Sequence, residues 1–267
     1  MWEVIYGRNS VHEALRAGRR DCQAVLVAEG IQEKGTAAQI LTVAQERHIP
    51  VRRVPRQQLE QLGPVNHQGV AAQVAPYPYV ELEVMLKLAQ ERKEMPFLLL
   101  LDCLQDPQNL GSLLRTAEVV AVHGVVIPVH RAAEVTPAVS NASAGAVEHL
   151  LVARVTNLVR TMEQLKERGV WVVGLEYMAD AQEFDRADLS MPLALVVGSE
   201  GQGLGRLVRE RCDLWIKLPM QGRVNSLNAS VAGSIALYEA WRQRQDKAAA
   251  TRQAAPDSAP VGAGWSN

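Results

Sequence analysis

The sequence predicts an α/β protein whose C-terminal part is built on a parallel sheet and whose N-terminal part is a smaller α/β domain. The main observation is a series of continuous apolar runs from residue 97 onward, alternating with stretches of helical periodicity. The runs are "FLLLLD", "GVVIP", "LLVARV", "VWVVGLE", "LALVVG" and "LWIKLP". Strands without polar alternation are typical of a parallel sheet that helices cover on both faces.

The chain before this series differs in pattern and in charge. Residues 1–75 contain strand-like runs at 24–28 ("AVLVA") and 70–74 ("VAAQV"), with a helical stretch at 36–47 between them. They carry nine Lys/Arg and seven Asp/Glu, a net charge of +2, whereas residues 96–245 carry fourteen and sixteen, a net charge of −2. We therefore expect residues 1–75 to form a separate domain.

Composition predicts the remaining boundaries. Pro76 and Pro78 interrupt regular structure and the charged segment 81–94 leads to Pro96, so we expect a linker over residues 76–95. The sheet domain then spans residues 96–245. Residues 246–267 are rich in Ala, Pro, Gly and Ser, and we expect a disordered tail there.

The overall composition favours a soluble globular protein, with 48% apolar and 21% charged residues. The net charge of −1 does not by itself indicate nucleic-acid binding. Cys22, Cys103 and Cys212 are widely spaced and form no CxxC, which favours free thiols in a reducing cytosol over a zinc site. No apolar run is long enough to cross a membrane. We expect a cytoplasmic protein with no membrane and no metal partner.

The first polar motif follows the first apolar run, in "LDCLQDPQNLGSLLRTA" at residues 101–117. A strand ends at Asp102, and a helix that carries Arg115 begins near Asn109. Taken alone, the segment is explained by helix capping through Asp106 or Asn109. However, loops at the carboxyl edge of a parallel sheet are where α/β proteins bind ligands.

The second motif is "LVVGSEGQGLG" at residues 195–205, in which glycines crowd around Glu200 after a buried strand. Such glycines indicate unusual backbone angles or a close approach of the backbone to a ligand. A dinucleotide-binding fingerprint requires a different glycine spacing that leads into a helix. A nicotinamide-dependent oxidoreductase is therefore disfavoured.

The third motif is "WIKLPMQGRVNSLNAS" at residues 215–230, at the entrance to a helix. One side chain among Asn225, Ser226 and Asn228 suffices to cap the helix. The additional polar residues indicate that this helix entrance also holds a polar ligand.

In this order and spacing, "DPQNLGSLLRTA", "GSEGQGL" and "LPMQGRVNSLNASVA" resemble the three motifs of the SpoU family (also called TrmH) of RNA ribose 2′-O-methyltransferases. This family is one group of the trefoil-knotted SPOUT methyltransferases. "YGRNSVHEALRAG" and "NHQGVAAQV" also resemble the start and end of the RNA-binding domain that precedes the catalytic domain in many members. This layout is similar to that of RlmB-like enzymes, which methylate a guanosine of 23S ribosomal RNA.

The resemblance implies a trefoil knot in the C-terminal domain, S-adenosyl-L-methionine as cofactor, structured RNA as substrate and pairing into a homodimer. The residues that it assigns to the cofactor are Gly198, Leu218, Ser226, Leu227 and Asn228. The residues that it assigns to catalysis are Asn109, Arg115, Glu200 and Asn228.

Arginine chemistry constrains two of these expectations. A guanidinium keeps its proton in proteins, so we favour Arg115 as a ligand of phosphate or of a developing alkoxide, and its role as a base stays open. Surface arginines must supply the RNA contacts, given the net charge of −1. The candidates are Arg8, Arg16, Arg19, Arg20, Arg52, Arg53, Arg56, Arg206 and Arg209.

Two alternatives remain beside the ribosomal RNA methyltransferase. One is a tRNA 2′-O-methyltransferase of the same family. The other is a non-catalytic RNA-binding factor for ribosome assembly, which predicts loss of Arg115, Glu200 or Asn228, although all three are present.

Overall fold

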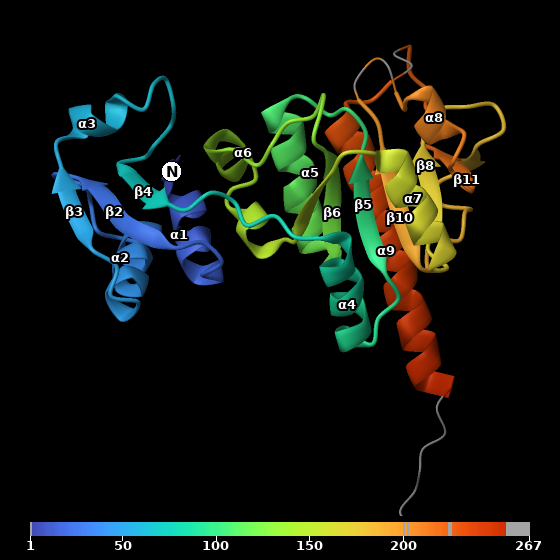
Figure 1. Cartoon of the computed structure of the whole chain (residues 1–267), viewed down its shortest axis with the longest axis horizontal. Helices are drawn as coiled ribbons and strands as arrows, with labels where there is room; N and C mark the ends of the chain where they lie inside the picture. Colours follow the sequence, from blue (N-terminus) through green and yellow to red (C-terminus); the bar gives the residue numbers. More distant parts are fainter. Residues whose placement is uncertain (1, 200, 202, 224–225, 255–267) are drawn as a thin grey trace, which may run out of the picture.

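The N-terminal domain is a small four-stranded sheet with helices packed on it (Figure 1). The computed structural model describes residues 2–199, 201, 203–223 and 226–254. The elements of this domain are β1 (Glu3–Tyr6), α1 (Arg8–Ala17), β2 (Cys22–Ala28), α2 (Thr36–Glu46), β3 (Val51–Val54), α3 (Arg56–Glu60) and β4 (Val70–Val74). The strand order is β1-β4-β2-β3, with β4 antiparallel to both neighbours and β2 parallel to β3. The two strand-like runs and the helical stretch of the sequence are thus β2, β4 and α2.

The C-terminal domain contains a seven-stranded sheet in the order β7-β6-β5-β10-β8-β11-β9, and each neighbouring pair is parallel. Its strands are β5 (Phe97–Leu101), β6 (Gly124–Pro128), β7 (Val152–Val155), β8 (Trp171–Leu175), β9 (Gln182–Glu183), β10 (Leu193–Val197) and β11 (Leu214–Lys217). Its helices are α5 (Pro107–Val119), α6 (Pro137–Ala142), the 3₁₀ helix η1 (Ala146–His149), α7 (Leu158–Glu167), α8 (Arg206–Arg209) and α9 (Ala229–Ala254). The α/β fold with a parallel sheet is confirmed. The trefoil knot stays a prediction.

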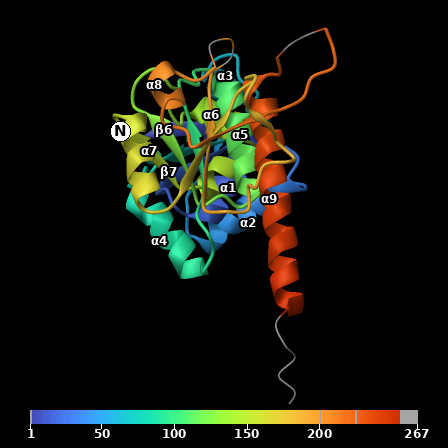
Figure 2. The ribbon, with the colours of Figure 1, turned by 90° about the vertical axis from the view of Figure 1, so that its right-hand side faces the viewer.

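Helices cover both faces of this sheet, which explains why its strands are apolar throughout. Leu99 and Leu101 of β5 belong to the core under α5, α6 and α9. Leu98 and Leu100 belong to the opposite core, under α4 (Leu82–Arg92), α7 and α8. In Figure 2, α9 lies on one side of the domain and α4 and α7 on the other. Because successive side chains of a strand point to opposite faces, both sets must be apolar.

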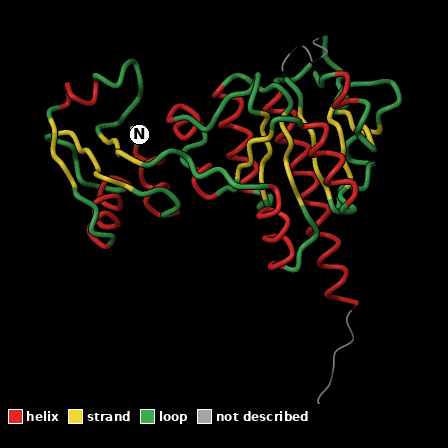
Figure 3. Tube along the Cα trace, viewed as in Figure 1, coloured by secondary structure: helices red, strands yellow, loops and turns green. Residues whose placement is uncertain are grey.

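The segment 76–95, for which we expect a linker, contains the helix α4 (Leu82–Arg92). Leu82, Met85 and Ala89 on this helix are buried, and the first two belong to the core of the sheet domain. The charged segment is therefore amphipathic and packs on the sheet. Within the predicted linker, only the residues before α4 connect the two domains. Figure 3 shows the strands gathered in two separate groups with this connection between them.

The last helix is longer than predicted. α9 continues to Ala254 and so includes the first part of the segment 246–267, for which we expect disorder. The stretch "KAAATRQA" is rich in alanine and long straight side chains, which have high helix propensity and extend a helix already anchored upstream. Ala236, Leu237 and Ala240 supply that anchor in the core. Among the described residues, none of the helices combines the length and hydropathy needed to span a membrane.

Candidate active site

The glycine-rich loop after β10 folds back tightly on itself. Ser199 and Gly203 exchange two backbone N–H···O hydrogen bonds of 3.1 Å each. A Cβ at Gly198 would lie 2.4 Å from the carbonyl oxygen of Gly203, closer than any side chain tolerates. Gly203 itself has a φ of +63°, in the left-handed region that favours glycine. Close backbone approach therefore explains the glycine at position 198.

Asp102 fixes this loop to the neighbouring strand. Its backbone N–H donates to Val197 O at 2.9 Å, and its Oδ2 accepts from the backbone N–H of Gly205 at 2.7 Å. The side chain lies in a buried position directly after β5. In the sequence, Asp102 is predicted only as the end of a strand. An acidic residue at the carboxyl end of a parallel strand was the available signal.

The entrance of α9 is organised by Asn228. Its Oδ1 accepts from the backbone N–H of Ser230 at 2.9 Å and of Val231 at 3.2 Å, which makes it the N-cap. Its Nδ2 donates to Oδ1 of Asn109 at 2.8 Å. Asn109 is buried in the first turn of α5, and the N-cap of that helix is Asp106. One amide group thus caps α9 and connects it to α5.

A pocket of about 310 Å³ lies at the carboxyl ends of β8, β10 and β11, beside the entrance of α9. Its lining comprises Leu175, Glu176, Tyr177, Val197, Gly198, Ser199, Gly201, Gly203, Leu218, Met220, Ser226, Leu227, Ala229 and Ala232. Four of the five residues predicted for the cofactor are in this lining, and the fifth, Asn228, is the cap of the helix beside it. Leu227 is 45% exposed, so its side chain is accessible to a ligand.

Glu176 was not predicted as part of the site. It lines the pocket directly after β8, and its carboxylate pairs with the guanidinium of Arg209, whose Nε lies 3.1 Å from Oε2. Arg209 is one of the arginines predicted to contact RNA. This pairing holds its guanidinium against a carboxylate of the pocket lining, while the Arg209 side chain stays 41% exposed.

The predicted catalytic residues do not all gather at the pocket. Asn109 and Asn228 are in direct contact. Arg115 is exposed on α5, is absent from the pocket lining and makes no hydrogen bond or ion pair to the rest of the described chain. Glu200 lies outside the described residues, as does Asn225.

Two of the arginines predicted to contact RNA have a structural role instead. The side chain of Arg20 is only 1% exposed and pairs with Glu148, so RNA cannot reach it. Arg19 donates to the carbonyl of Pro78 at 3.3 Å and to Tyr77 Oη at 3.1 Å. Nothing in the local sequence distinguishes these two residues from surface arginines, because contacts between distant segments bury Arg20 and partly bury Arg19.

A second, basic hollow lies on the N-terminal domain. It has a volume of about 290 Å³ and is lined by Arg8, Lys34 and Arg56, together with Gln68 and the loop after β2. Arg52 and Arg53 are exposed on the adjacent strand β3. Within the described part of the chain, no group of three or more His, Cys, Asp or Glu residues is placed to hold a metal ion.

The fold and the pocket define an α/β protein with a ligand site at the carboxyl edge of a parallel sheet. Comparison with known proteins identifies the family within this class. Residues 96–238 match the SpoU rRNA methylase family, and residues 4–80 match the "RNA 2′-O ribose methyltransferase substrate binding" domain. The Bacillus subtilis (strain 168) protein provisionally named "TrmH family tRNA/rRNA methyltransferase YacO" is 50% identical over 91% of this chain and 96% of its own length.

Two solved structures share the whole two-domain arrangement. The SpoU methyltransferase AviRb from Streptomyces viridochromogenes, in complex with AdoMet, superposes with a TM-score of 0.75 and 25% identity over 91% of this chain and 90% of its own. A structure described as an RNA 2′-O ribose methyltransferase gives a TM-score of 0.72 and 25% identity, over 91% and 88% of the two chains. The chain belongs to the SpoU/TrmH family of S-adenosylmethionine-dependent RNA methyltransferases.

Proposed function

We propose that this enzyme methylates a ribose 2′-hydroxyl in structured RNA, and that its target is a guanosine of 23S ribosomal RNA. The observation that carries this proposal is the pocket in which Gly198, Leu218, Ser226 and Leu227 meet. These residues come from two motifs of the family and gather beside the contact between Asn109 and Asn228. The match of residues 4–80 to a ribose methyltransferase substrate-binding domain supports the 2′-O position.

The residues of the pocket fit S-adenosylmethionine. When bound, the cofactor supplies a methyl group activated by a sulfonium. The space that a Cβ at Gly198 would fill is occupied by the backbone of Gly203, so the loop presents main-chain groups rather than side chains to the pocket. Ser226 and Leu227 add a polar and an apolar wall at the entrance of α9. Such a combination suits a ligand with an adenine ring and a polar amino-acid end.

Arg115 acts on the RNA in this proposal. A guanidinium that keeps its proton can grip the phosphate next to the target ribose and stabilise the alkoxide as it forms. The side chain is exposed and makes no ion pair within the described chain, which leaves its charge available to a substrate. Glu200 is proposed to orient the polar groups that neighbour it in the second motif. Most of the rate enhancement then comes from positioning the hydroxyl against the donor.

The RNA-binding surface is proposed to include the basic hollow of the N-terminal domain. Arg8, Lys34 and Arg56 converge there around Glu29, and Arg52 is exposed on β3. Because phosphates dominate RNA affinity, such a group of charges is an effective docking site even in a chain of net charge −1.

The enzyme is proposed to work as a homodimer. Val231, Ile235 and Tyr238 lie at helical spacing along α9 and are between 38% and 53% exposed. Val119, at the end of the neighbouring helix α5, is 63% exposed. A continuous apolar stripe of this kind is typical of a surface that a second copy covers. Tyr238→Glu should shift the protein to a monomer in sedimentation velocity, whereas Val84→Glu, at an exposed apolar position of α4, should not.

The proposal is tested with methyl-labelled S-adenosylmethionine and two acceptors, unmodified 23S ribosomal RNA and bulk tRNA. We expect label in 2′-O-methylguanosine of the ribosomal RNA, with Arg115→Ala and Asn228→Ala each lowering the rate about 100-fold or more. Label in tRNA alone would retain the chemistry and overturn the substrate. If the cofactor binds but neither RNA is labelled, the target is a different RNA or the protein is a non-catalytic RNA-binding factor.

A further inference from the structure

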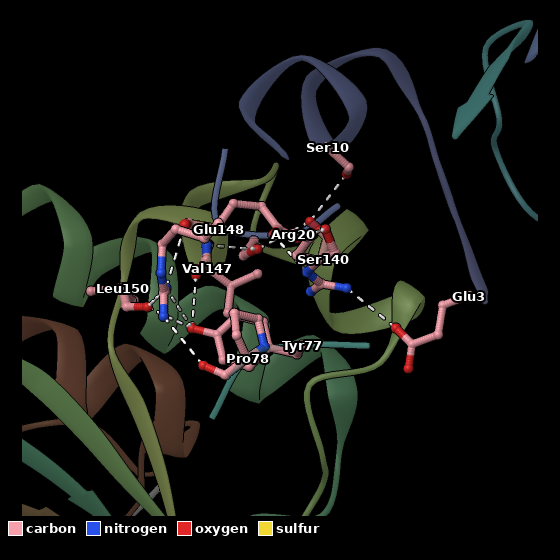
Figure 4. A network of polar contacts seen from close by, with 11 residues as sticks. Glu3, Ser10, Arg20, Tyr77, Pro78, Ser140, Val147, Glu148 and Leu150 are labelled. Carbon is pink, nitrogen blue, oxygen red and sulfur yellow. Dashed lines mark hydrogen bonds and ion pairs between the residues drawn. The ribbon is translucent and has the colours of Figure 1, made fainter. Parts of the chain in front are cut away.

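A buried ion pair joins the two domains (Figure 4). Arg20 follows α1 in the N-terminal domain, and Glu148 lies in η1 of the sheet domain. The Nε of Arg20 is 2.9 Å from Oε2 of Glu148, and each side chain is only 1% exposed. Arg20 also pairs with Glu3 at 3.2 Å, and Oε1 of Glu148 accepts from Ser140 Oγ at 3.0 Å. Carboxylates of both domains therefore flank the Arg20 guanidinium, while its Nη2 has no hydrogen-bond partner among the described residues.

The connection between the domains is bound to the same place. The hydroxyl of Tyr77 donates to the carbonyl of Leu150 at 2.6 Å, directly after η1. Arg19 donates to that carbonyl as well and reaches Pro78 O at 3.3 Å. The guanidinium carbon of Arg20 lies 4.9 Å from the centre of the Tyr77 ring. The N-terminal domain, the connection and η1 thus form one polar cluster.

The backbones of the two domains also approach too closely to slide past each other. A Cβ at Gly145 would lie 2.7 Å from Cβ of Glu13 in α1. Ser10 Oγ donates to Ser140 O at 3.1 Å in a buried position, and Asn141 Nδ2 donates to Tyr6 O at 3.2 Å. These contacts of the N-terminal domain with α6 and with the start of η1 therefore fix the relative position of the two domains, in addition to the ion pair.

Interfaces between domains of one chain normally resemble transient interfaces and allow relative motion. A buried ion pair is different, because a shifted interface that stays closed would leave each charge buried away from its partner. Such a pair adds little net stability over apolar packing, but it penalises every alternative orientation. The cluster around Arg20 and Glu148 therefore selects one arrangement of the two domains.

We propose that Arg20 and Glu148 are positioning residues that hold the basic hollow of the N-terminal domain at a fixed place relative to the cofactor pocket. This inference rests on the proposed function. With the two domains fixed, the enzyme selects structured RNAs whose phosphates reach the hollow while the target ribose reaches the pocket. A short RNA that fills only the pocket gains nothing from the fixed arrangement. The span between the two surfaces is then a determinant of specificity.

The first test uses the unaltered protein. We expect ¹⁵N relaxation to give one rotational correlation time for amides of both domains, and small-angle scattering to match the docked arrangement. Two separate correlation times would overturn the proposal. Neither measurement depends on methylation, so failure of the proposed function and failure of this inference are distinguishable.

The second test compares Glu148→Gln with Glu134→Gln, which alters an ion pair with Arg154 inside the sheet domain. Glu148→Gln should release the domains in the relaxation experiment and leave the affinity for S-adenosylmethionine within about twofold. It should lower kcat/KM for a folded ribosomal RNA fragment by about 10-fold to 100-fold, because misplacement by an ångström has effects of this size. A short oligonucleotide with the same target should be methylated as before, and Glu134→Gln should change neither substrate.

Equal losses on both RNAs, or docked domains in Glu148→Gln, would contradict the proposal. If Glu148→Gln does not fold, the double variant Arg20→Met/Glu148→Met removes both charges and keeps apolar volume in the interface. It is expected to fold and to show the same selective loss on the folded RNA. Retention of wild-type kcat/KM on that RNA would overturn the positioning role.

Discussion

Asn228 Nδ2 donates a 2.8 Å hydrogen bond to Oδ1 of Asn109, across 119 residues of sequence. The same Asn228 side chain caps α9 through its oxygen. The first and third motifs of the family are therefore connected in this chain by one amide group. A change at either asparagine affects the position of both helices beside the pocket.

The hydrogen bond between Asn228 and Asn109 can be tested separately from the capping of α9 by Asn228. Asn228→Asp keeps the oxygen that caps α9 but removes the donor to Asn109, whereas Asn228→Ala removes both. We expect Asn228→Ala to lower the free energy of unfolding by about 1 kcal/mol more than Asn228→Asp, the typical contribution of an N-cap. Urea denaturation measures the difference, and a double-mutant cycle with Asn109→Ala measures the coupling. Equal stabilities of the two Asn228 variants would contradict the capping role.

Gly198→Ala should damage the pocket. Its Cβ would collide with the carbonyl of Gly203, so the loop must move. We expect the dissociation constant for S-adenosylmethionine, measured by calorimetry, to rise about 10-fold or more, equivalent to about 1.4 kcal/mol. Gly201→Ala, in the same loop, tests backbone strain instead, since Gly201 has a φ of +78° and nothing lies within 4 Å of an added Cβ. An equal effect of both variants would show that loop stiffness, rather than the close approach, matters.

Asp102→Ala should loosen the glycine loop without touching the cofactor. It leaves the backbone N–H of Gly205 without its acceptor, at a cost of about 1–3 kcal/mol in the free energy of unfolding. Asp102→Asn retains an acceptor oxygen and should restore most of this stability. Thermal unfolding with and without S-adenosylmethionine measures both effects. If Asp102→Asn is as damaging as Asp102→Ala, the charge of Asp102 is required instead.

His123 should make stability depend on pH. Its Nδ1 accepts from the backbone N–H of Phe97 at 3.0 Å, and its Nε2 lies 3.0 Å from Oε2 of Glu94. Burial lowers the pKa of His123; Glu94 opposes the shift, while Arg92 and Arg244 add to it. The unfolded chain therefore binds this proton at a higher pH than the folded protein does.

The sign of the effect follows from that difference. The stability linked to His123 is complete above its unfolded pKa of about 6.5 and is lost as the pH falls through the lower folded value. We expect urea unfolding to show a declining free energy between pH 7.5 and 5.5 that is shallower in His123→Gln, whose amide oxygen can accept from Phe97. Identical slopes in the two proteins would refute the assignment to His123.

Local patterns in the sequence were sufficient for six of the seven strands of the C-terminal sheet. The apolar runs correspond to β5, β6, β7, β8, β10 and β11, because strands buried on both faces leave a pattern that needs no partner to be recognised. The resemblance of the motifs to those of the family assigned Gly198, Leu218, Ser226 and Leu227 to the cofactor, and the structure brings these four residues into one pocket. Each of them lies directly after a strand or before a helix, where local sequence is informative.

Other features depended on the tertiary structure, because they are relationships between distant elements. Asp102 meets the glycine loop only because β5 lies beside β10, and that strand order cannot be read from the order along the chain. Arg20 reads as a surface arginine until domain docking buries it against Glu148. Local sequence thus determined the elements and the motif residues, while the packing of the strands and domains decided which polar groups face the pocket and which bind the domains together.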